Sequence, residues 1–128
     1  MKNTFLLFSV FLLLFGCRPS VKVNPGPAKI EFEELEYDFG KYSILEEREH
    51  TFTFANTGSE PLVIQKAETS CTCTQIEYPK EPIMPGKRGK IKLTYQARQK
   101  HGHFKRNVFV YSNGSEQPVT ISIMGEQH

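Results

Sequence analysis

The strongest constraint on the fold is an alternation of apolar and polar residues that recurs in short segments along the chain. In residues 50–55, Phe52 and Phe54 share one face of an extended chain, and two threonines share the other. Residues two apart in a strand project to the same side, so each such segment has one face suited to a core. Beyond Pro27 we find no helical periodicity, and the pattern predicts an all-β protein.

Turn signals separate these segments. Asn113-Gly114 is the strongest hairpin signal, because both residues tolerate positive φ. Asn56-Thr57-Gly58 and Pro85-Gly86 are further turn sequences. The predicted strands cover residues 29–32, 35–39, 50–55, 62–68, 75–78, 89–97, 103–111 and 119–124. A set of about seven to eight short strands in a chain of this length predicts an immunoglobulin-like antiparallel β-sandwich.

Three of the later strands show clear alternation. In residues 89–97 we expect Ile91, Leu93 and Tyr95 to point inward. In residues 103–111, Val108 and Val110 share one face and Phe109 and Tyr111 the other, and in residues 119–124 one face holds Val119, Ile121 and Ile123. A chain of 128 residues can bury such a core in a single domain.

The N-terminal segment has a different composition. Lys2 is followed by an apolar run over residues 4–15, which is shorter than the roughly 20 residues of a membrane-spanning helix. Such a run fits the hydrophobic region of a signal peptide. The run ends in Leu14-Phe15-Gly16-Cys17, which resembles the lipobox of bacterial lipoproteins, although Phe15 stands where a small residue is commoner. The alternative is an ordinary signal peptide with an incidental cysteine.

The lipobox resemblance implies cleavage before Cys17 and acylation of that cysteine. Two or three acyl chains would anchor the protein durably, whereas one chain binds a membrane only marginally. Residues 17–27 contain three prolines and a glycine, which suit a semi-extended tether. We therefore predict a signal peptide over residues 1–16, a lipidated tether over 17–27 and a folded domain over 28–128. The expected location is the bacterial cell envelope, with the domain on the periplasmic side because no acidic run follows Cys17.

Charge argues against nucleic acid as a partner. The chain has 16 Lys and Arg residues against 14 Asp and Glu residues. The basic residues between Lys80 and Arg106 are interleaved with other types, which is typical of a solvated strand face rather than a concentrated basic patch. The sequence also lacks a phosphate-binding glycine loop of the usual spacing. We predict no cofactor, no small-molecule substrate and no enzymatic activity.

Several short motifs together resemble one family. They are Tyr37-Asp38-Phe39-Gly40, Phe52-Thr53-Phe54-Ala55-Asn56-Thr57-Gly58, Pro61-Leu62-Val63-Ile64, Ser70-Cys71-Thr72-Cys73-Thr74, Pro82-Ile83-Met84-Pro85-Gly86-Lys87-Arg88-Gly89 and Tyr111-Ser112-Asn113. In this order they resemble the DUF1573 family over residues 31–125. Its members are similar to the immunoglobulin-like domains of the major sperm protein and ASPM–SPD-2–Hydin type. The resemblance implies the fold and the compartment but no activity.

One position departs from that family. Thr72 stands between the two cysteines where members usually have glycine, and a β-branched residue does not favour positive φ. We therefore expect an extended backbone from Cys71 to Cys73.

The Cys71/Cys73 pair is the one chemically distinctive feature of the predicted domain. The two thiols could pack as small apolar groups, form a strained or reversible disulfide, bind a soft metal, or bond to another protein. A metal site could be completed by His101 and His103. A cysteine nucleophile would need a base and an oxyanion site, and no local signature of these accompanies either cysteine.

The sequence predicts two candidate functions from different classes. The first is a non-catalytic binding or structural module, anchored through Cys17, that presents loops or a strand edge to another envelope protein. The alternative is a thiol-based redox or soft-metal-binding protein that uses Cys71 and Cys73.

Overall fold

The computed structural model describes residue 21 and residues 26–98 and 101–128. The predicted signal peptide and Cys17 lie outside the described residues. The strands in the described part are β1 (Ile30–Phe32), β2 (Glu36–Tyr42), β3 (Arg48–Asn56), β4 (Ile64–Glu68), β5 (Thr74–Glu77), β6 (Arg88–Tyr95), β7 (Gly102–Ser112) and β8 (Val119–Gln127). Each predicted strand is therefore confirmed, with its ends moved by a few residues. This part of the chain contains no helix long and apolar enough to cross a bilayer.

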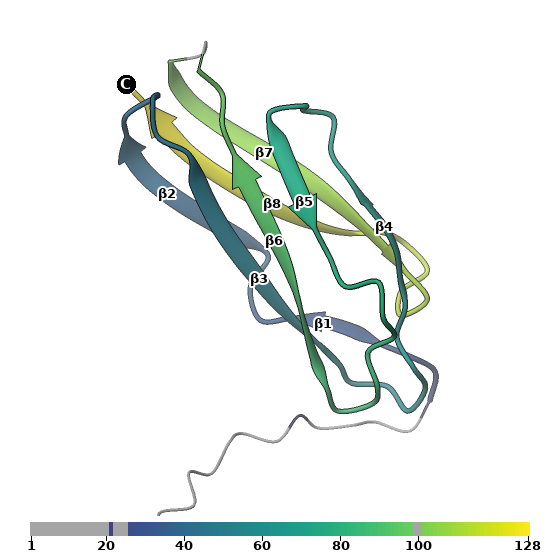
Figure 1. The fold of residues 1–128 in the computed structure, drawn as a ribbon. Helices are drawn as coiled ribbons and strands as arrows, with labels where there is room; N and C mark the ends of the chain where they lie inside the picture. The colour runs from purple at the N-terminus through teal and green to yellow at the C-terminus, as the bar shows by residue number, and fades with distance from the viewer. Residues whose placement is uncertain (1–20, 22–25, 99–100) are drawn as a thin grey trace, which may run out of the picture.

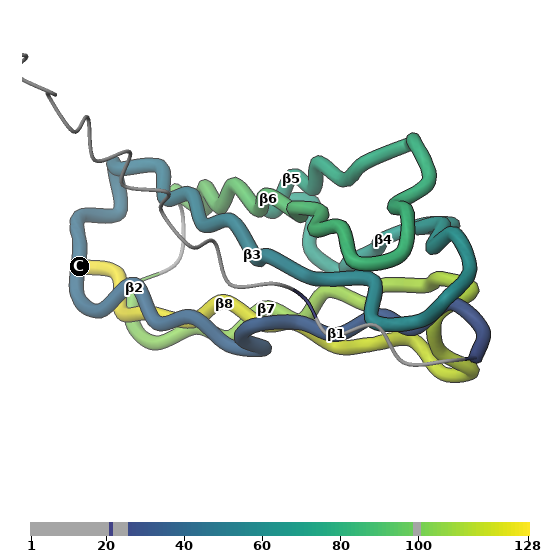
Figure 2. Tube along the Cα trace, turned by 90° about the horizontal axis from the view of Figure 1, so that it is seen from below, coloured from purple at the N-terminus to yellow at the C-terminus, as the bar shows by residue number. Residues whose placement is uncertain are grey.

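The strands form two sheets of four, in the orders β1-β3-β6-β5 and β2-β8-β7-β4. Figure 1 shows the strands, and Figure 2 shows the two layers, with β3 and β6 in one and β7 and β8 in the other. Each sheet turns one face toward the other, so alternating residues of both sheets meet in a shared core. The predicted all-β sandwich is confirmed.

The prediction that the sandwich is antiparallel throughout was wrong for one pair of strands. β2 runs parallel to β8, with Glu36 opposite Ser122. The chain changes sheet between β1 and β2: the Glu33 amide donates to Thr53 in the first sheet, and the Leu35 carbonyl accepts from Ser122 in the second. Along the sequence, strands β3 to β7 come between β2 and β8. They provide the long connection that a parallel pair needs. Apolar alternation marks strand faces but carries no information on strand direction.

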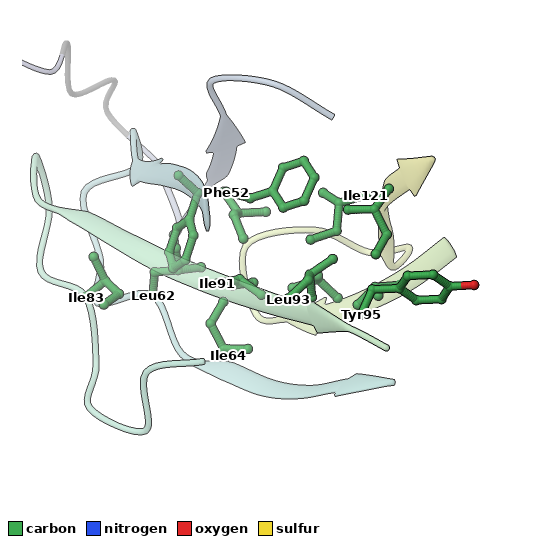
Figure 3. Close-up of a cluster of buried hydrophobic side chains, with 14 of the residues drawn as sticks. Phe52, Leu62, Ile64, Ile83, Ile91, Leu93, Tyr95 and Ile121 are labelled. Carbon is green, nitrogen blue, oxygen red and sulfur yellow. The ribbon is translucent and has the colours of Figure 1, made fainter. Parts of the chain in front are cut away.

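The core lies between the sheets, and the inward face predicted for Ile91, Leu93 and Tyr95 is confirmed (Figure 3). Tyr95 lies at one end of the cluster drawn there and Ile83 at the other. The apolar side chains with no exposed surface are Phe52, Phe54, Leu62, Ile91, Leu93, Tyr95, Val108, Ile121 and Ile123. Burying each large apolar side chain contributes about 1.5–3 kcal/mol, so this cluster is the main source of stability.

The predicted turn at Asn113-Gly114 was wrong in its geometry. β7 and β8 do pair antiparallel, but residues 113–118 connect them, and neither Asn113 nor Gly114 has a positive φ. The Asn113 side chain instead accepts from the Val63 amide at 2.8 Å and donates to the Pro61 carbonyl at 3.0 Å. A Cβ on Gly114 would lie 2.7 Å from the Ile30 amide nitrogen. Glycine is needed here for close packing against β1 rather than for a left-handed turn.

The described chain enters the sandwich at the end that carries the β3–β4 loop. Gly26 and Ser59 exchange backbone and side-chain hydrogen bonds, and a Cβ on Gly58 would lie 1.9 Å from the Pro27 carbonyl oxygen. The β4–β5 connection, with both cysteines, lies at the other end (Figure 1).

Candidate functional site

The candidate site is the turn at residues 71–74, where the chain crosses from the edge of one sheet to the edge of the other. β4 is an edge strand of the second sheet and β5 an edge strand of the first. The Thr74 amide donates to the Cys71 carbonyl at 3.2 Å and closes the turn. The Gln96 amide donates to the Cys73 carbonyl at 3.0 Å and fixes the turn to the end of β6.

In the structure Cys71 and Cys73 are joined by a disulfide, and their Cα atoms are 5.2 Å apart. The expectation of an extended backbone between them was wrong, because residues 72 and 73 form a turn. No residue other than glycine has a positive φ among those described. A type I turn needs no positive φ, so threonine can stand between the cysteines without forcing the chain to extend.

The disulfide lies at the surface beside two pockets. The larger has a volume of about 560 Å³ and is lined by Cys71, Thr72, Cys73, Gln96, Ala97, Arg98 and Arg106. The smaller has a volume of about 130 Å³ and is lined by Glu47, Thr72, Cys73, Gln75, Thr94 and Gln96. Both cysteines are half-buried, so a reagent in solution can approach the bond between them.

The sequence does not single out Gln96, Ala97, Arg98 or Arg106 as lining residues, and Arg106 has the most distinctive environment of the four. It occupies an inward position of β7, in register with Phe104 and Val108, both of which are buried. Its guanidinium carbon lies 5.8 Å from the centre of the Tyr95 ring, and its Nη1 donates to the Lys105 carbonyl at 3.1 Å. Its buried Nε has no hydrogen-bond partner within the described part of the chain. The signal in the sequence is an arginine that interrupts an apolar alternation, whereas the charge argument assigns this arginine to a solvated face.

Aromatic rings line this end of the core. Tyr95 and Phe104 stack with their ring centres 4.2 Å apart, and Arg48 lies 4.7 Å from the centre of the Tyr42 ring. Burial is the largest cause that raises the pKa of Tyr42 to about 12, so its hydroxyl stays neutral at physiological pH. Cations over aromatic faces are stabilised by about 0.5–2 kcal/mol, which explains how arginines are accommodated here.

The histidines considered as metal ligands do not join the cysteines. His103 lies 3.8 Å from Glu126, and neither it nor His101 lines the pockets beside the disulfide. Within the described residues no group of three or more His, Cys, Asp or Glu side chains could hold a metal ion. His50 lies between the sheets, stacked on Tyr37 at 3.6 Å and 2.5 Å from a Glu34 carboxylate oxygen.

The disulfide closes a loop of only three residues, and its contribution to stability should be small. The chain-entropy relation gives about 1.5 kcal/mol for such a loop, below the 2–4 kcal/mol of a typical disulfide. We expect the Cys71→Ser/Cys73→Ser double variant to keep its sandwich and to lose about that much free energy of unfolding. Guanidinium titration followed by circular dichroism measures this loss of free energy. A loss above about 4 kcal/mol would show that the bond is mainly structural.

The strand order defines the chain as an immunoglobulin-like, PapD-like β-sandwich. It is similar to the ASH/PapD-like domain 7 of human CEP192, with a TM-score of 0.65 and 11% identity over 100% of this chain and 96% of that one. A Porphyromonas gingivalis W83 protein of unknown function gives a TM-score of 0.67 at 13% identity, over 88% of this chain and 51% of that one. The chain thus spans about half the length of that protein. At these identities the similarity shows the fold alone.

A partial similarity to a larger protein shows the same fold. The Vibrio cholerae VesB protease gives a TM-score of 0.64 at 13% identity, over 77% of this chain and 32% of the protease. No curated protein matches the sequence. The chain belongs to the DUF1573 family, described as a protein of unknown function, which matches residues 30–127. The family resemblance noted in the sequence is confirmed.

Proposed function

We propose that this protein is a lipoprotein of the bacterial cell envelope, held to a membrane by lipid on Cys17, whose sandwich is a non-catalytic binding or structural module. The observation that carries the proposal is the apolar run of residues 4–15 ending in Leu14-Phe15-Gly16-Cys17. That run is too short to span a bilayer and ends where a lipoprotein would be cleaved and acylated.

The geometry of the domain is compatible with such an anchor. The described chain enters at the Gly26 and Ser59 end, opposite the turn that holds Cys71 and Cys73. A proline-rich tether over residues 17–27 would reach about 30 Å at the rise of a polyproline helix. A lipid on Cys17 would then be attached at the end of the domain opposite the turn.

The binding role is supported by the free strand edges. β1 and β5 form the edges of the first sheet, and β2 and β4 those of the second. Such edges carry unpaired backbone groups that can accept an extended segment of another protein. β2, at seven residues, is the longest of them, and Leu35 beside it is 50% exposed. We propose another envelope protein as the partner.

Replacing Cys17 tests the anchor. We expect Cys17→Ala to move the protein from the membrane fraction to the soluble fraction, because no acyl chain can then be attached. The measurement is membrane fractionation with labelling by a radioactive fatty acid. Cys71→Ser serves as the matched control, because it removes a different thiol and should leave the protein on the membrane. Unchanged membrane association of the Cys17→Ala protein would refute the anchor.

Cross-linking in intact cells tests the binding role. The full chain should form a discrete cross-linked species with another envelope protein, and this species should weaken when Cys17→Ala releases the chain from the membrane. Recovery of the chain alone, at cross-linker levels that capture known envelope complexes, would contradict a binding module.

A further inference from the structure

We propose that the Cys71–Cys73 disulfide is a thiol-exchange centre that accepts two electrons from a protein dithiol, with Cys71 released as the thiolate and Arg106 stabilising it. This activity goes beyond the anchored binding module and does not depend on it, so either proposal can fail without the other.

The bond is placed where exchange can occur. It lies in a surface turn between two edge strands, and both half-buried cysteines line a pocket of about 560 Å³. Thiol–disulfide exchange needs a thiolate to reach one sulfur in line with the bond, so an exposed disulfide reacts and an enclosed one does not.

The surroundings favour negative charge on Cys71. The Cys73 amide nitrogen lies 3.3 Å from Cys71 Sγ and donates to it, and hydrogen bonds to an ionised acceptor are the stronger kind. Arg98 and Arg106 line the same pocket, and no carboxylate is among the described residues that line it. Positive neighbours and backbone N–H groups are the features that make a thiolate stable.

Cys73 has a different environment. It packs against the core and also borders the smaller pocket, which Glu47 lines. A carboxylate nearby opposes negative charge. Of the two sulfurs, Cys71 is therefore the better leaving group and Cys73 the sulfur that is attacked.

Arg106 can act on the sulfur because its charge is held in place and is not neutralised. Tyr95 and Phe104 pack around its guanidinium, with ring centres 5.8 Å and 6.0 Å from its central carbon. Its hydrogen bond goes to a backbone carbonyl, and within the described part of the chain no carboxylate pairs with it. A charge that is partly buried in this way acts more strongly on its neighbours than one in water.

The exchange consists of two successive thiolate attacks. A donor thiolate attacks Cys73 Sγ, a bond forms between the two sulfurs, and the Cys71–Cys73 bond breaks with its electron pair left on Cys71. The second donor thiolate then attacks the first donor sulfur, and Cys73 leaves as a thiolate. The donor dithiol becomes a disulfide, and Cys71 and Cys73 gain two electrons and leave as thiolates; the two protons that the donor thiols lost on ionising pass to solvent, from which the product thiolates can take them up.

Reduction should leave the sandwich intact. β4 stays paired with β7, and β5 stays paired with β6, through ladders that do not involve either sulfur. The centre can therefore be reduced and reoxidised in the folded protein.

The test is reduction of the full chain, purified in mild detergent, by dithiothreitol without denaturant. Free thiols are counted at intervals with a maleimide that adds mass. We expect two thiols to appear beyond any present before reduction while the circular dichroism spectrum is unchanged, and to disappear again on addition of oxidised glutathione. Appearance of thiols only when guanidinium unfolds the protein would overturn the proposal.

Variants at position 106 test the role of the charge. We expect Arg106→Met to slow reduction about fivefold or more, because the leaving thiolate loses a cation, and Arg106→Lys to recover most of the rate. Arg88→Met, at the far end of β6, is the matched control and should leave the rate unchanged. Equal rates for Arg106→Met and the wild type would refute the assigned role.

Single-cysteine variants keep the proposal testable if Arg106→Met does not fold. Cys71 in the Cys73→Ser variant should react with iodoacetamide at neutral pH about fivefold faster than Cys73 in the Cys71→Ser variant. An equal or reversed order would show that Cys71 is not the favoured thiolate.

Discussion

Replacing Asn56 by alanine is expected to lower the free energy of unfolding by about 3 kcal/mol or more. The Asn56 side chain is fully buried at the end of β3. Its amide nitrogen donates to the carbonyls of Glu60 at 2.7 Å and Ile83 at 2.9 Å, and its oxygen accepts from the amides of Gly58 at 3.0 Å and Lys29 at 3.3 Å. Alanine would remove all four hydrogen bonds. The Ile83 carbonyl would keep the bond that it accepts from the Leu62 amide, but the Gly58 and Lys29 amides would lose theirs. A buried group left unpaired costs about 1–3 kcal/mol.

Asn113→Ala is the matched control for Asn56→Ala. Asn113 also bridges backbone groups of a neighbouring loop, those of Pro61 and Val63, but it is exposed. Water can replace its hydrogen bonds, so we expect a loss of about 1 kcal/mol or less. Guanidinium unfolding of the full-length variants measures both. Equal and small losses for the two variants would contradict the role of Asn56 as a buried link between β1, β3 and the chain near Ile83.

Replacing Gly89 by valine is the second large effect. Gly89 lies directly opposite Phe54 in the β3–β6 ladder, and a Cβ at Gly89 would lie 2.4 Å from Phe54 Cζ. Strand propensity alone would favour valine over glycine by up to about 1 kcal/mol. Because the Phe54 ring fills the space of the missing side chain, we expect a loss of about 3 kcal/mol instead. Thermal unfolding followed by circular dichroism gives the sign and the size of the change in stability.

Two further variants separate the clash from other causes. Lys90→Val makes a similar gain in strand propensity at the next, exposed position of β6, and its stability should be unchanged or slightly raised. Gly89→Val in a Phe54→Leu background should cost less than it does in the wild type, because the smaller side chain leaves room. An additive double variant would show that Phe54 does not occupy that space.

The strands and the core could be predicted from the sequence because they depend on local alternation. Phe52 and Phe54, like Ile121 and Ile123, recur at a spacing of two, and all four are fully buried. Each strand covers one face and exposes the other, so the pattern alone reports burial.

Features that depend on long-range contacts could not be predicted in this way. The parallel pairing of β2 with β8 joins residues far apart in the chain, such as Tyr37 and Ile123. Asn56 and Gly114 were assigned to ordinary turns, because their partners lie in other loops that the local sequence does not reveal.

The candidate site was predicted in part. The spacing of Cys71 and Cys73 drew attention to the pair, but the backbone between them was wrongly expected to be extended. Arg106 comes from β7, more than thirty residues further along the chain, and enters the pocket because β7 lies beside the β4–β5 crossover. Its one local signal is a charge at an inward position, which a net-charge argument overlooks.

Intact mass spectrometry of the protein extracted from membranes, treated with iodoacetamide but with no reductant, tests most directly whether this is an anchored sandwich with an oxidised cysteine pair. We expect a chain that begins at Cys17, carries acyl groups on that residue and contains no alkylated cysteine. A mass that includes residues 1–16, or a Cys17 without lipid, would contradict the membrane anchor, and two alkylated thiols would contradict the disulfide.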